Sequence, residues 1–498
     1  MSRLLLLSTY ELGARPLGCT VPAAHLGAAG HGAVAVDLAV EPWPADRLAE
    51  VDGVVLSVPM HTAWRLGLGV VERLRAERPE LPLFLHGLYA EAAADAAADL
   101  LGPGDVAASG EVAAELVAWA DRLGRPAADG PRRRRTLGPA RTGPRPAQAR
   151  AGLPGLDAYA VLHVDGETRL VGTLESSTGC NHRCRHCPVP AVYGGRSRAV
   201  ALEAVMADAA ALVAEGARHL HLADPDFLNR PAHAAAFAQA LAGTFPAVTF
   251  DATIKVSHLL RHEGLVGELA TCGMRFVISA LESTSDTVLA RLDKGHTADD
   301  GRRAVRLLRR CGVEPRPSFL PFTPWTTRDD VVALLDFVAA EDLVWNVDAV
   351  QYGIRLLLPP GSLLLDEPDP ALAAALTGAD PEAGGTGWLS GDPALDHCQA
   401  AVAACAETLE AEGAGAEAAY EAVRATALDV LGRSGAGRPA PAGLLGPPGP
   451  LRPRLSESWF CCAEPTGRQR GGVGTGGGAG CSAQAPVTAP SSPRRRPS

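Results

Sequence analysis

The sequence lacks the long apolar runs and the excess of positive charge that mark membrane and nucleic-acid proteins. No apolar run approaches the ~20 residues of a membrane-spanning helix, and the leucines of MSRLLLLSTYE are too few for a signal-peptide core. Lys and Arg number 46 against 56 Asp and Glu, a net charge of −10, whereas a phosphate-binding face is basic. These absences predict a soluble cytoplasmic protein that acts on a small molecule, with no nucleic acid and no membrane as partner.

The 11 cysteines of such a protein are expected to be reduced thiols or metal ligands, because cytoplasmic disulfides are rare. Five of them stand in apolar helical or strand contexts, and we interpret them as core residues: Cys19, Cys272, Cys311, Cys398 and Cys405. Three others stand together in GCNHRCRHCPVP, residues 179–190, with the spacing C-x3-C-x2-C. A chemical role is therefore expected mainly of the second group.

Residues 1–125 alternate short apolar runs with helical stretches. Strands are expected at Leu4–Leu7, Ala33–Asp37, Gly53–Ser57, Leu83–Leu85 and Asp105–Ala108. Five β–α units of this kind predict an α/β domain with a doubly wound parallel sheet. Ligands of such sheets bind beyond the carboxyl ends of the strands.

Residues 126–158 are rich in Pro, Arg and Gly and are predicted to be a linker, with the run Arg132–Arg135 solvated. Residues 159–365 alternate strands and helices again. Strands are expected at Arg169–Ser176, His219–Ala223, Thr249–Lys255, Phe276–Ala280, Pro315–Leu320 and Asp348–Ile354. About six β–α units predict a partial (β/α)6 barrel, which carries its chemistry at the carboxyl ends of the strands.

The remainder of the chain changes composition twice. Residues 366–435 are Ala-rich and predicted to be helical, and residues 436–498 are mostly Gly, Pro, Ala, Ser and Arg and are predicted to be disordered. One island, SESWFCCAEPTG at 456–467, interrupts this tail.

The loop with three cysteines admits two kinds of metal centre. A structural zinc needs four ligands, so a zinc site here would be completed by His182 or His186. A [4Fe–4S] cluster instead tolerates one iron without a cysteine, so three thiolates leave that iron open to a ligand that is not protein. The neighbouring Arg and His residues favour thiolates, and the loop follows a predicted strand, which sets it at the mouth of the barrel.

The motif C-x3-C-x2-C directly after the first barrel strand resembles the radical SAM superfamily. The resemblance implies that Cys180, Cys184 and Cys187 hold a [4Fe–4S] cluster whose open iron binds S-adenosylmethionine. One electron, from a donor such as flavodoxin or ferredoxin, then cleaves the sulfonium to methionine and a 5′-deoxyadenosyl radical. The residue before the last cysteine, here His186, is expected near the adenine.

Further cofactor-binding residues are expected at the ends of later strands. The superfamily uses the edge after the second strand to hold the amino group of the cofactor, so Asp224 and Asp226 are candidates, although its glycine-rich form is absent and Asp226 could equally cap a helix. Charged or polar residues end or follow the other strands: Lys255, Glu282, Ser283, Lys294 and Arg355. For Lys294 and Arg355 an ion pair that closes the barrel rim is the alternative.

The N-terminal pattern STYELGA, SVPMHTA, GLYA and SGE resembles the cobalamin-binding domain that precedes many radical SAM domains. The Asp-x-His-x-x-Gly signature that supplies a histidine to cobalt is absent, and His61 and His86 follow the wrong strands for that ligand. The alternative is a domain that binds nothing and only covers the barrel mouth.

The stretch WFCCAEPTG resembles the signature of the CUAEP/CCAEP-tail radical SAM proteins, some of which carry selenocysteine where this chain has Cys462. The resemblance implies a catalytic role for Cys461 and Cys462, docked by Trp459 and Phe460. Exposed, unused thiols are the alternative. The chain departs from that group by continuing well past Cys462, with a further cysteine at Cys481.

Three functions follow from these patterns. The first is a radical SAM enzyme that modifies an unidentified small molecule, with cobalamin-dependent methyl transfer as one candidate reaction. The second is radical insertion of sulfur or selenium that uses the tail thiols. The third is a metal-binding or redox-sensing protein without catalysis.

Overall fold

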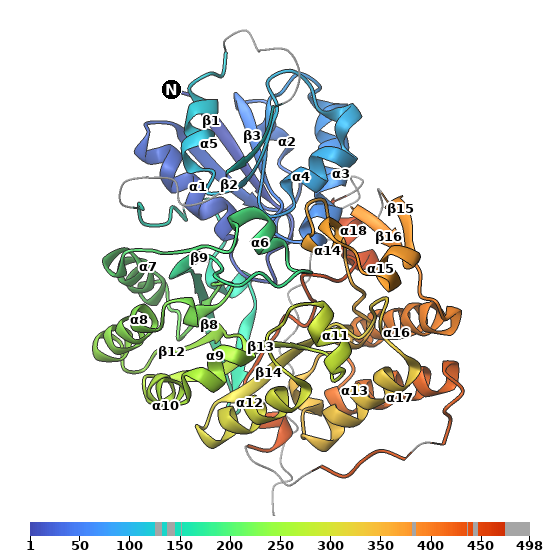
Figure 1. Ribbon diagram of the computed structural model, residues 1–498. Helices are drawn as coiled ribbons and strands as arrows, with labels where there is room; N and C mark the ends of the chain where they lie inside the picture. Colours follow the sequence, from blue (N-terminus) through green and yellow to red (C-terminus); the bar gives the residue numbers. More distant parts are fainter. Residues whose placement is uncertain are drawn as a thin grey trace, which may run out of the picture.

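The computed structural model describes residues 1–124, 145–150, 152–380, 385–435, 437–441 and 447–473, together with the backbone of residues 132–136. An N-terminal α/β part lies above a larger part built on a second sheet, with the short helix α6 (Pro188–Tyr193) between them (Figure 1). Much of the predicted linker and tail, including Cys481, lies outside the described residues. Among the described helices, none combines the length and the apolar character that a membrane span requires.

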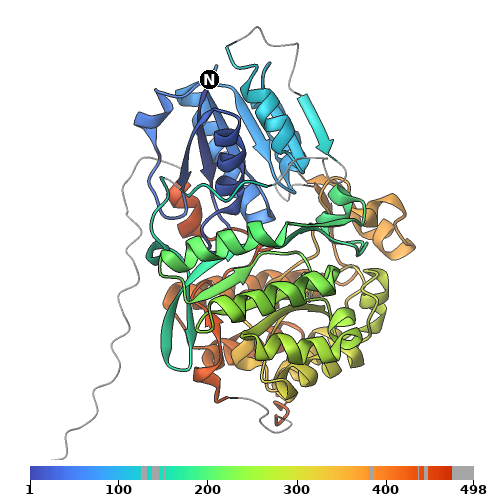
Figure 2. The same cartoon turned by 90° about the vertical axis from the view of Figure 1, so that its left-hand side faces the viewer.

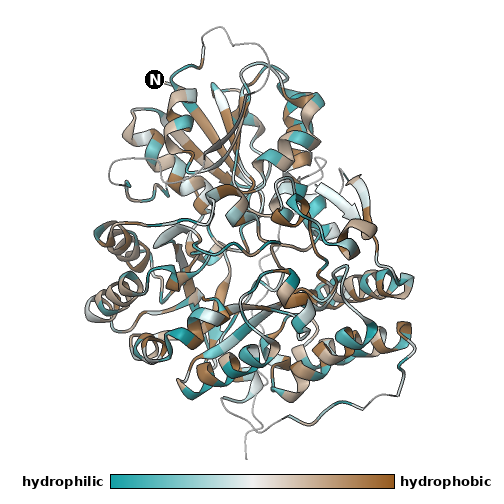
Figure 3. Cartoon of the chain, in the orientation of Figure 1, coloured by the Kyte–Doolittle hydropathy of each residue, from teal (hydrophilic) through white to brown (hydrophobic). Residues whose placement is uncertain are grey.

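The N-terminal sheet is parallel throughout, in the order β2-β1-β3-β4-β5-β6. Leu4 and Leu6 pack in one apolar cluster while Leu5 and Leu7 pack in another, because successive side chains of a strand point to opposite faces. Both faces are thus covered by helices, and Figure 3 shows apolar strands enclosed between them. The strands and helices of this part are β1 (Arg3–Ser8), α1 (Leu17–Ala28), β2 (Gly32–Asp37), α2 (Ala45–Leu48), β3 (Gly53–Ser57), α3 (His61–Glu77), β4 (Leu83–His86), α4 (Ala90–Ala96), η1 (Ala98–Leu100), β5 (Val106–Gly110), α5 (Ala113–Ala120) and β6 (Arg132–Thr136). The predicted doubly wound sheet is confirmed.

The strand β6 is a departure from the sequence prediction. It pairs in parallel with β5 over Val106 to Gly110, within the segment that composition assigned to a linker. That assignment is wrong here, because an edge strand needs only backbone hydrogen bonds on one side and tolerates charged residues.

The second sheet has the order β14-β13-β12-β11-β8-β7-β17. Its five strands from β14 to β8 are parallel and curl into an open half-barrel, while β7 and β17 add an antiparallel edge. Figure 2 shows the row of helices that covers its outer face. The strands are β7 (Val161–Val164), β8 (Glu167–Leu174), β11 (His219–Leu222), β12 (Thr249–Thr253), β13 (Met274–Glu282), β14 (Glu314–Phe319) and β17 (Arg454–Leu455). The helices that follow its strands are α7 (Leu202–Ala214), α8 (Pro231–Thr244), α9 (Val256–Arg261), α10 (Glu263–Thr271), α11 (Asp286–Arg291), α12 (Ala298–Arg310) and α13 (Arg328–Ala340).

The predicted sixth barrel strand, Asp348–Ile354, is wrong. The segment forms the 3-10 helix η5 (Ala349–Gly353), and only the bridge between Phe322 and Arg355 continues the parallel pairing. Gly353 lies so close to α16 (Pro393–Glu412) that a Cβ there would stand 3.0 Å from Ala403. A short buried apolar run does not distinguish strand from helix by periodicity, and here packing against α16 decides.

Shorter elements complete the fold. A two-stranded ribbon, β9 (Ser177–Gly179) with β10 (Ser197–Ala199), flanks the three-cysteine loop. Residues 366–435 are largely helical as predicted, with an added hairpin of β15 (Leu376–Asp380) and β16 (Gly385–Trp388). The remaining elements are η2 (Leu156–Ala158), η3 (Phe227–Asn229), η4 (Val344–Asn346), α14 (Leu363–Asp366), α15 (Pro370–Ala375), α17 (Ala416–Val430), η6 (Gly449–Leu451) and α18 (Gly467–Val473).

The described part of the tail is ordered, so the prediction of disorder is wrong for residues 447–473. β17 pairs with β7, and the guanidinium of Arg452, 3% exposed, binds Asn346 Oδ1 at 2.7 Å and the Asp342 carboxylate. Trp459 joins the apolar cluster under α3. Composition did not predict this order, because a few anchoring side chains stabilise the segment in spite of the polar residues around them.

Candidate active site

The three-cysteine loop connects β9 to α6. Cys187 precedes α6, whose first residue is Pro188, and proline at that position starts a helix readily. Cys184 is buried, and Cys180 and Cys187 are partly buried. Burial raises the pKa of the Cys187 thiol to about 12 and raises that of Cys180, so these thiols need a metal to become thiolates near neutral pH.

The zinc alternative fits this loop poorly. His186 Nε2 lies 3.0 Å from Glu282 Oε1, and His182 Nε2 lies 3.3 Å from Asp226 Oδ2, so both imidazoles are directed to carboxylates. Among the described residues, the three thiols do not form a group whose ligand atoms all lie within 4.8 Å of one another. A single tetrahedral zinc with Zn–S bonds of ~2.3 Å would hold its sulfurs about 3.8 Å apart. The wider spacing suits thiolates that bind separate irons of a cluster.

A buried charged group borders the loop at the end of β13. Glu282 accepts from Lys294 Nζ at 3.1 Å and faces His186. Burial acts to raise the pKa of Glu282, but Lys294 and His186 outweigh it and hold this pKa well below its usual range. Glu282 also has φ +63°, a left-handed backbone that costs free energy for a residue with a Cβ and is typical of functional sites.

The chain has only two lysines among its 46 Lys and Arg residues, and both lie at this loop. Lys255 Nζ is 3.4 Å from Cys184 Sγ, and Lys294 pairs with Glu282. A lysine ammonium is a compact point charge, whereas a guanidinium is a wide planar fork. Lysine rather than arginine at these two positions fits a crowded site that contains thiols and a carboxylate.

The two aspartates after β11 have different surroundings. Asp224 lines the main cavity and accepts from Ser176 N at 2.7 Å and Ser176 Oγ at 2.8 Å. Asp226 accepts from Leu228 N and caps η3, as the helix-cap alternative predicted. Its second oxygen faces His182 and His258, so Asp226 is directed away from the cavity that Asp224 lines.

Two other candidates are occupied by local contacts. Ser283 Oγ accepts from Ser285 N at 3.1 Å. Arg355 binds Asp396 at 2.8 Å, and its guanidinium lies 3.7 Å from the ring centroid of Trp388. Arg355 is thus not brought together with the cluster loop, and its contacts match the ion-pair alternative.

The tail carries Cys461 and Cys462 to the junction of the two parts. Thr62, at the start of α3, donates through Oγ1 to the carbonyls of Phe460 and Ala463, and His61 Nε2 lies 2.7 Å from Glu464 Oε1. The two thiols lie 3.6 Å apart. The neighbouring Cys461 and burial raise the pKa of Cys462. Cys461 lines the same cavity as Cys187 of the cluster loop.

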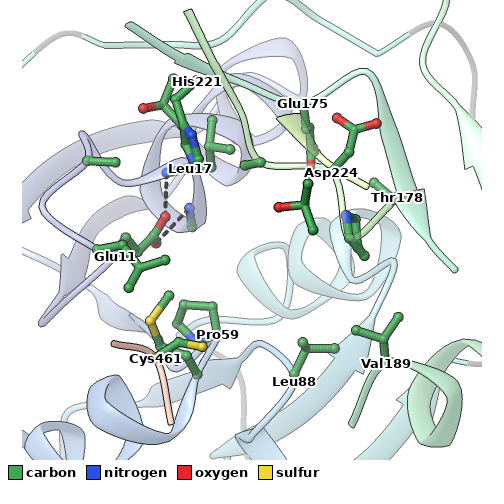
Figure 4. Close-up of a pocket in the computed structure, with 18 of the residues that line it drawn as sticks. Glu11, Leu17, Pro59, Leu88, Glu175, Thr178, Val189, His221, Asp224 and Cys461 are labelled. Atoms are coloured by element: carbon green, nitrogen blue, oxygen red, sulfur yellow. Dashed lines mark hydrogen bonds between the residues drawn. The ribbon is translucent and has the colours of Figure 1, made fainter. Parts of the chain in front are cut away.

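A cavity of about 1210 Å³ opens between the two parts. Its N-terminal wall comes from the carboxyl ends of the first sheet, and its opposite wall comes from the half-barrel interior and the cluster loop. Figure 4 shows Glu11, Cys461, Pro59 and Leu88 on one side and His221, Glu175 and Asp224 on the other. Cys187 also lines the cavity.

Two groups of the N-terminal wall are held uncharged, while Glu111 at the same sheet edge accepts from Thr178. Burial, helped by Asp37, raises the pKa of Glu11 to about 8, and burial lowers that of His86 to about 4, so both are mainly uncharged at pH 7. Glu11 accepts from Leu17 N at 2.8 Å and Gly18 N at 3.0 Å. A Cβ at Gly18 would stand 1.9 Å from Ser57 Oγ, so glycine is required where α1 meets the end of β3.

Sequence reasoning missed a polar group inside the half-barrel. His219 and His221 alternate along β11 and bind the two oxygens of Asp251 on β12, each at 2.8 Å. His221 lines the cavity, and Asp251 raises its pKa in spite of the opposing effect of burial. The signal was the HLHL alternation, because side chains two residues apart in a strand share one face.

Comparisons with solved structures define the fold class. The chain superposes on the cobalamin-dependent S-adenosylmethionine radical enzyme OxsB, solved with aqua-cobalamin bound, with a TM-score of 0.62 and 13% identity over 83% of this chain and 67% of that one. It also superposes on the radical S-adenosylmethionine methyltransferase TsrM from Kitasatospora setae, with a TM-score of 0.51 and 20% identity over 68% of this chain and 71% of that one. The fold is that of cobalamin-dependent radical SAM enzymes.

The family comparison identifies the catalytic domain. The Radical SAM superfamily matches residues 174–338, so this part of the chain is a radical SAM domain, the mark of an enzyme whose cofactors are a [4Fe–4S] cluster and S-adenosylmethionine. The ribosomal protein uS12 methylthiotransferases RimO of Moorella thermoacetica and Geobacter sulfurreducens are each 29% identical, over 34% and 33% of this chain. The chain spans only 42% and 39% of the lengths of these relatives.

Proposed function

We propose that the protein cleaves S-adenosylmethionine reductively at a cluster on Cys180, Cys184 and Cys187 and modifies a small molecule bound in the cavity. The observation that carries this proposal is the position of a loop with three buried or partly buried thiols at a cavity of about 1210 Å³, which Cys187 lines.

Each part of the site has a proposed role. The cluster supplies the electron that breaks the sulfonium bond of the bound cofactor. Lys255 stabilises the Cys184 thiolate, and the ion-paired group of His186, Glu282 and Lys294 orients hydrogen-bonding atoms beside the loop. Asp224 lines the cavity and is the candidate acceptor for the ammonium of the cofactor, although its oxygens already accept from Ser176 and Ser177. Ser283 remains a candidate for the ribose.

Cobalamin is proposed as the ligand of the N-terminal wall. This wall is mainly uncharged, which suits a large neutral ring system, and its close glycine packing at Gly18 leaves backbone rather than side chains at the sheet edge. His61 is ion-paired with Glu464, whereas His86 lines the cavity with an Nε2 that has no hydrogen-bond partner. The proposal that cobalt receives no histidine therefore rests on the missing Asp-x-His-x-x-Gly signature. Bound cobalamin would supply methyl transfer to an unreactive carbon. OxsB, which shares the fold, was solved with aqua-cobalamin bound.

A second function, sulfur or selenium insertion, is favoured by the tail. Cys461 lines the cavity, and the sulfur of Cys462 lies 3.6 Å from the sulfur of Cys461. The two RimO relatives are methylthiotransferases. Methyl transfer requires cobalamin and insertion requires the thiol pair, so the two reactions are separable.

The experiment is anaerobic reconstitution of the full chain with iron and sulfide, followed by S-adenosylmethionine and a strong reductant. We expect 5′-deoxyadenosine and methionine in equal amounts. Protein with a full iron complement that forms neither product would contradict the proposal.

A parallel experiment loads the protein with cobalamin. Retention through gel filtration, with no nitrogen hyperfine coupling in the electron resonance of the reduced form, supports methyl transfer. No retention at any supplied concentration rejects cobalamin and leaves thiol-dependent insertion.

A further inference from the structure

A second group of metal-ligand side chains lies at the cluster loop, outside the residues that line the cavity. It consists of His182 in the loop, Asp226 after β11 and His258 on α9. Among the described residues these form the one group of three or more whose ligand atoms all lie within 4.8 Å of one another. None of the three lines the main cavity, so the group is separate from the proposed substrate site.

The ligand atoms converge on one point. His182 Nε2 is 3.3 Å and His258 Nδ1 is 2.8 Å from the same oxygen, Asp226 Oδ2. Asp226 and His258 are 2% and 6% exposed. All three atoms are buried and lack a hydrogen bond of acceptable geometry, although burial of such groups without partners is costly.

The His219–Asp251–His221 group provides a comparison within the same chain. It has the same composition, but each imidazole there binds a different carboxylate oxygen at 2.8 Å with good hydrogen-bond geometry. In the His182–Asp226–His258 group both imidazoles face one oxygen, and the other oxygen is taken by Leu228 N. Well-formed hydrogen bonds therefore account for the first group, whereas the second crowds two imidazoles onto one oxygen with poor hydrogen-bond geometry.

We propose that His182, Asp226 and His258 bind a divalent transition-metal ion such as Zn²⁺. Two imidazoles and one carboxylate are a known three-residue ligand set for zinc, with a fourth position open to water. The 3.3 Å separation of His182 and Asp226 matches the ~3.3 Å edge of a tetrahedron with bonds of ~2.0 Å. The partial exposure of the His182 side chain, 21%, gives an ion access.

The site has a structural consequence for the cluster loop. His182 lies between Cys180 and Cys184, whereas Asp226 and His258 belong to the half-barrel. An ion bound by all three fixes the loop to the ends of β11 and β12 without using a thiolate. Its role is therefore to position the loop rather than to react.

The test adds one equivalent of Zn²⁺ to the reconstituted full chain, removes the excess by gel filtration, and measures zinc and iron per chain by mass spectrometry. Zinc K-edge absorption then reports the ligand atoms. We expect one zinc with only nitrogen and oxygen neighbours at ~2.0 Å. His258→Ala and Asp226→Asn should each lose that zinc and retain iron, while His221→Ala, the matched histidine of the comparison group, should retain both.

The contrary outcomes are equally definite. Absence of bound zinc in the parent, sulfur at ~2.3 Å in its shell, or the same zinc content in parent, His258→Ala and Asp226→Asn would each overturn the proposal. Loss of iron along with zinc in one variant is resolved by His258→Gln, which keeps the side-chain volume. If this variant holds iron and still holds zinc, the site is rejected. Because the readout is metal content, the result is independent of cofactor cleavage.

Discussion

The two walls of the cavity differ in charge although both are built from the carboxyl ends of parallel strands. Two charged contacts lie at the half-barrel rim beside the cluster loop, outside the residues that line the cavity: Lys255 against Cys184 and Lys294 against Glu282. The N-terminal wall carries groups that burial keeps neutral, with the pKa of Glu11 raised to about 8 and that of His86 lowered to about 4. The same architecture thus supplies an electrostatic site on one side and a nearly uncharged surface on the other.

This difference assigns separate tasks to the walls. Ionised groups in a low-dielectric site orient a charged cofactor strongly. An uncharged wall binds a ligand through buried area and shape, and its side chains do not take up a proton or a metal ion themselves. The predictions below alter one wall at a time.

The largest effect is expected from the thiols of the half-barrel rim. Replacing Cys180, Cys184 and Cys187 together by Ala should remove the iron, the absorbance near ~400 nm and all cofactor cleavage, because no other cysteine lies in that loop. Cys272→Ala, a cysteine packed against the half-barrel core, is the control and should keep all three. Iron content equal to that of the parent in the triple variant would show that the cluster lies elsewhere.

A smaller but still strong effect is expected at Glu282. Glu282→Gln leaves the buried Lys294 ammonium without its carboxylate and should lower the free energy of unfolding by about 3 kcal/mol. The double variant Glu282→Gln and Lys294→Met should recover part of that loss, and a denaturation midpoint measures both. Since the pKa of folded Glu282 lies below its ordinary value, its stabilising contribution is present above the unfolded pKa and falls as the pH is lowered. An unchanged midpoint for the single variant would contradict the ion pair.

The tail thiols should affect turnover and leave the cofactor reaction intact. Cys461→Ser or Cys462→Ser should form 5′-deoxyadenosine without substrate as the parent does, because the cluster ligands are untouched. Product formation on the true substrate should fall at least ~10-fold, as for loss of a group that acts directly in the chemistry. Parent-like turnover by both variants would exclude a role for the thiol pair.

The smallest effect is expected at Glu11 on the N-terminal wall. Folded Glu11 holds its proton up to pH ~8 while the unfolded carboxyl releases it near 4.5, so stability should fall as the pH rises between these values. Asp37, with its pKa raised to about 7, acts with the same sign. Glu11→Gln should reduce the loss of stability between pH 6 and 7.5 by about 2 kcal/mol. Unfolding midpoints across that range measure it, and an unaltered slope would show that Glu11 is ionised in the folded protein.

Patterns with local causes were predictable from the sequence. The apolar runs of β1 and β3 are present in the structure, and so are the capping boxes that the Thr-x-x-Asp patterns Thr297–Asp300 and Thr327–Asp330 indicate. Each is determined by residues close in the chain. The three-thiol loop was identifiable for the same reason. That Cys180, Cys184 and Cys187 bind a [4Fe–4S] cluster stays a prediction.

Features that depend on distant contacts were not predictable. The η5 segment follows from packing on α16, and the order of residues 447–473 follows from Arg452 and β17 meeting residues more than a hundred positions away. His182, Asp226 and His258 likewise come together from three separate segments, and their spacing in the sequence forms no motif. The surroundings of Arg355 depend on Trp388 and Asp396 in the C-terminal region.

The most direct measurement of the central claim is electron resonance of the reduced cluster before and after addition of S-adenosylmethionine. An iron that lacks a protein ligand binds the cofactor directly, so its spectrum should change on addition, and a cofactor labelled with ¹⁷O in its carboxylate should broaden the lines. A [4Fe–4S] signal that the cofactor leaves unchanged, or protein that binds zinc and no iron on these thiols, would contradict the account.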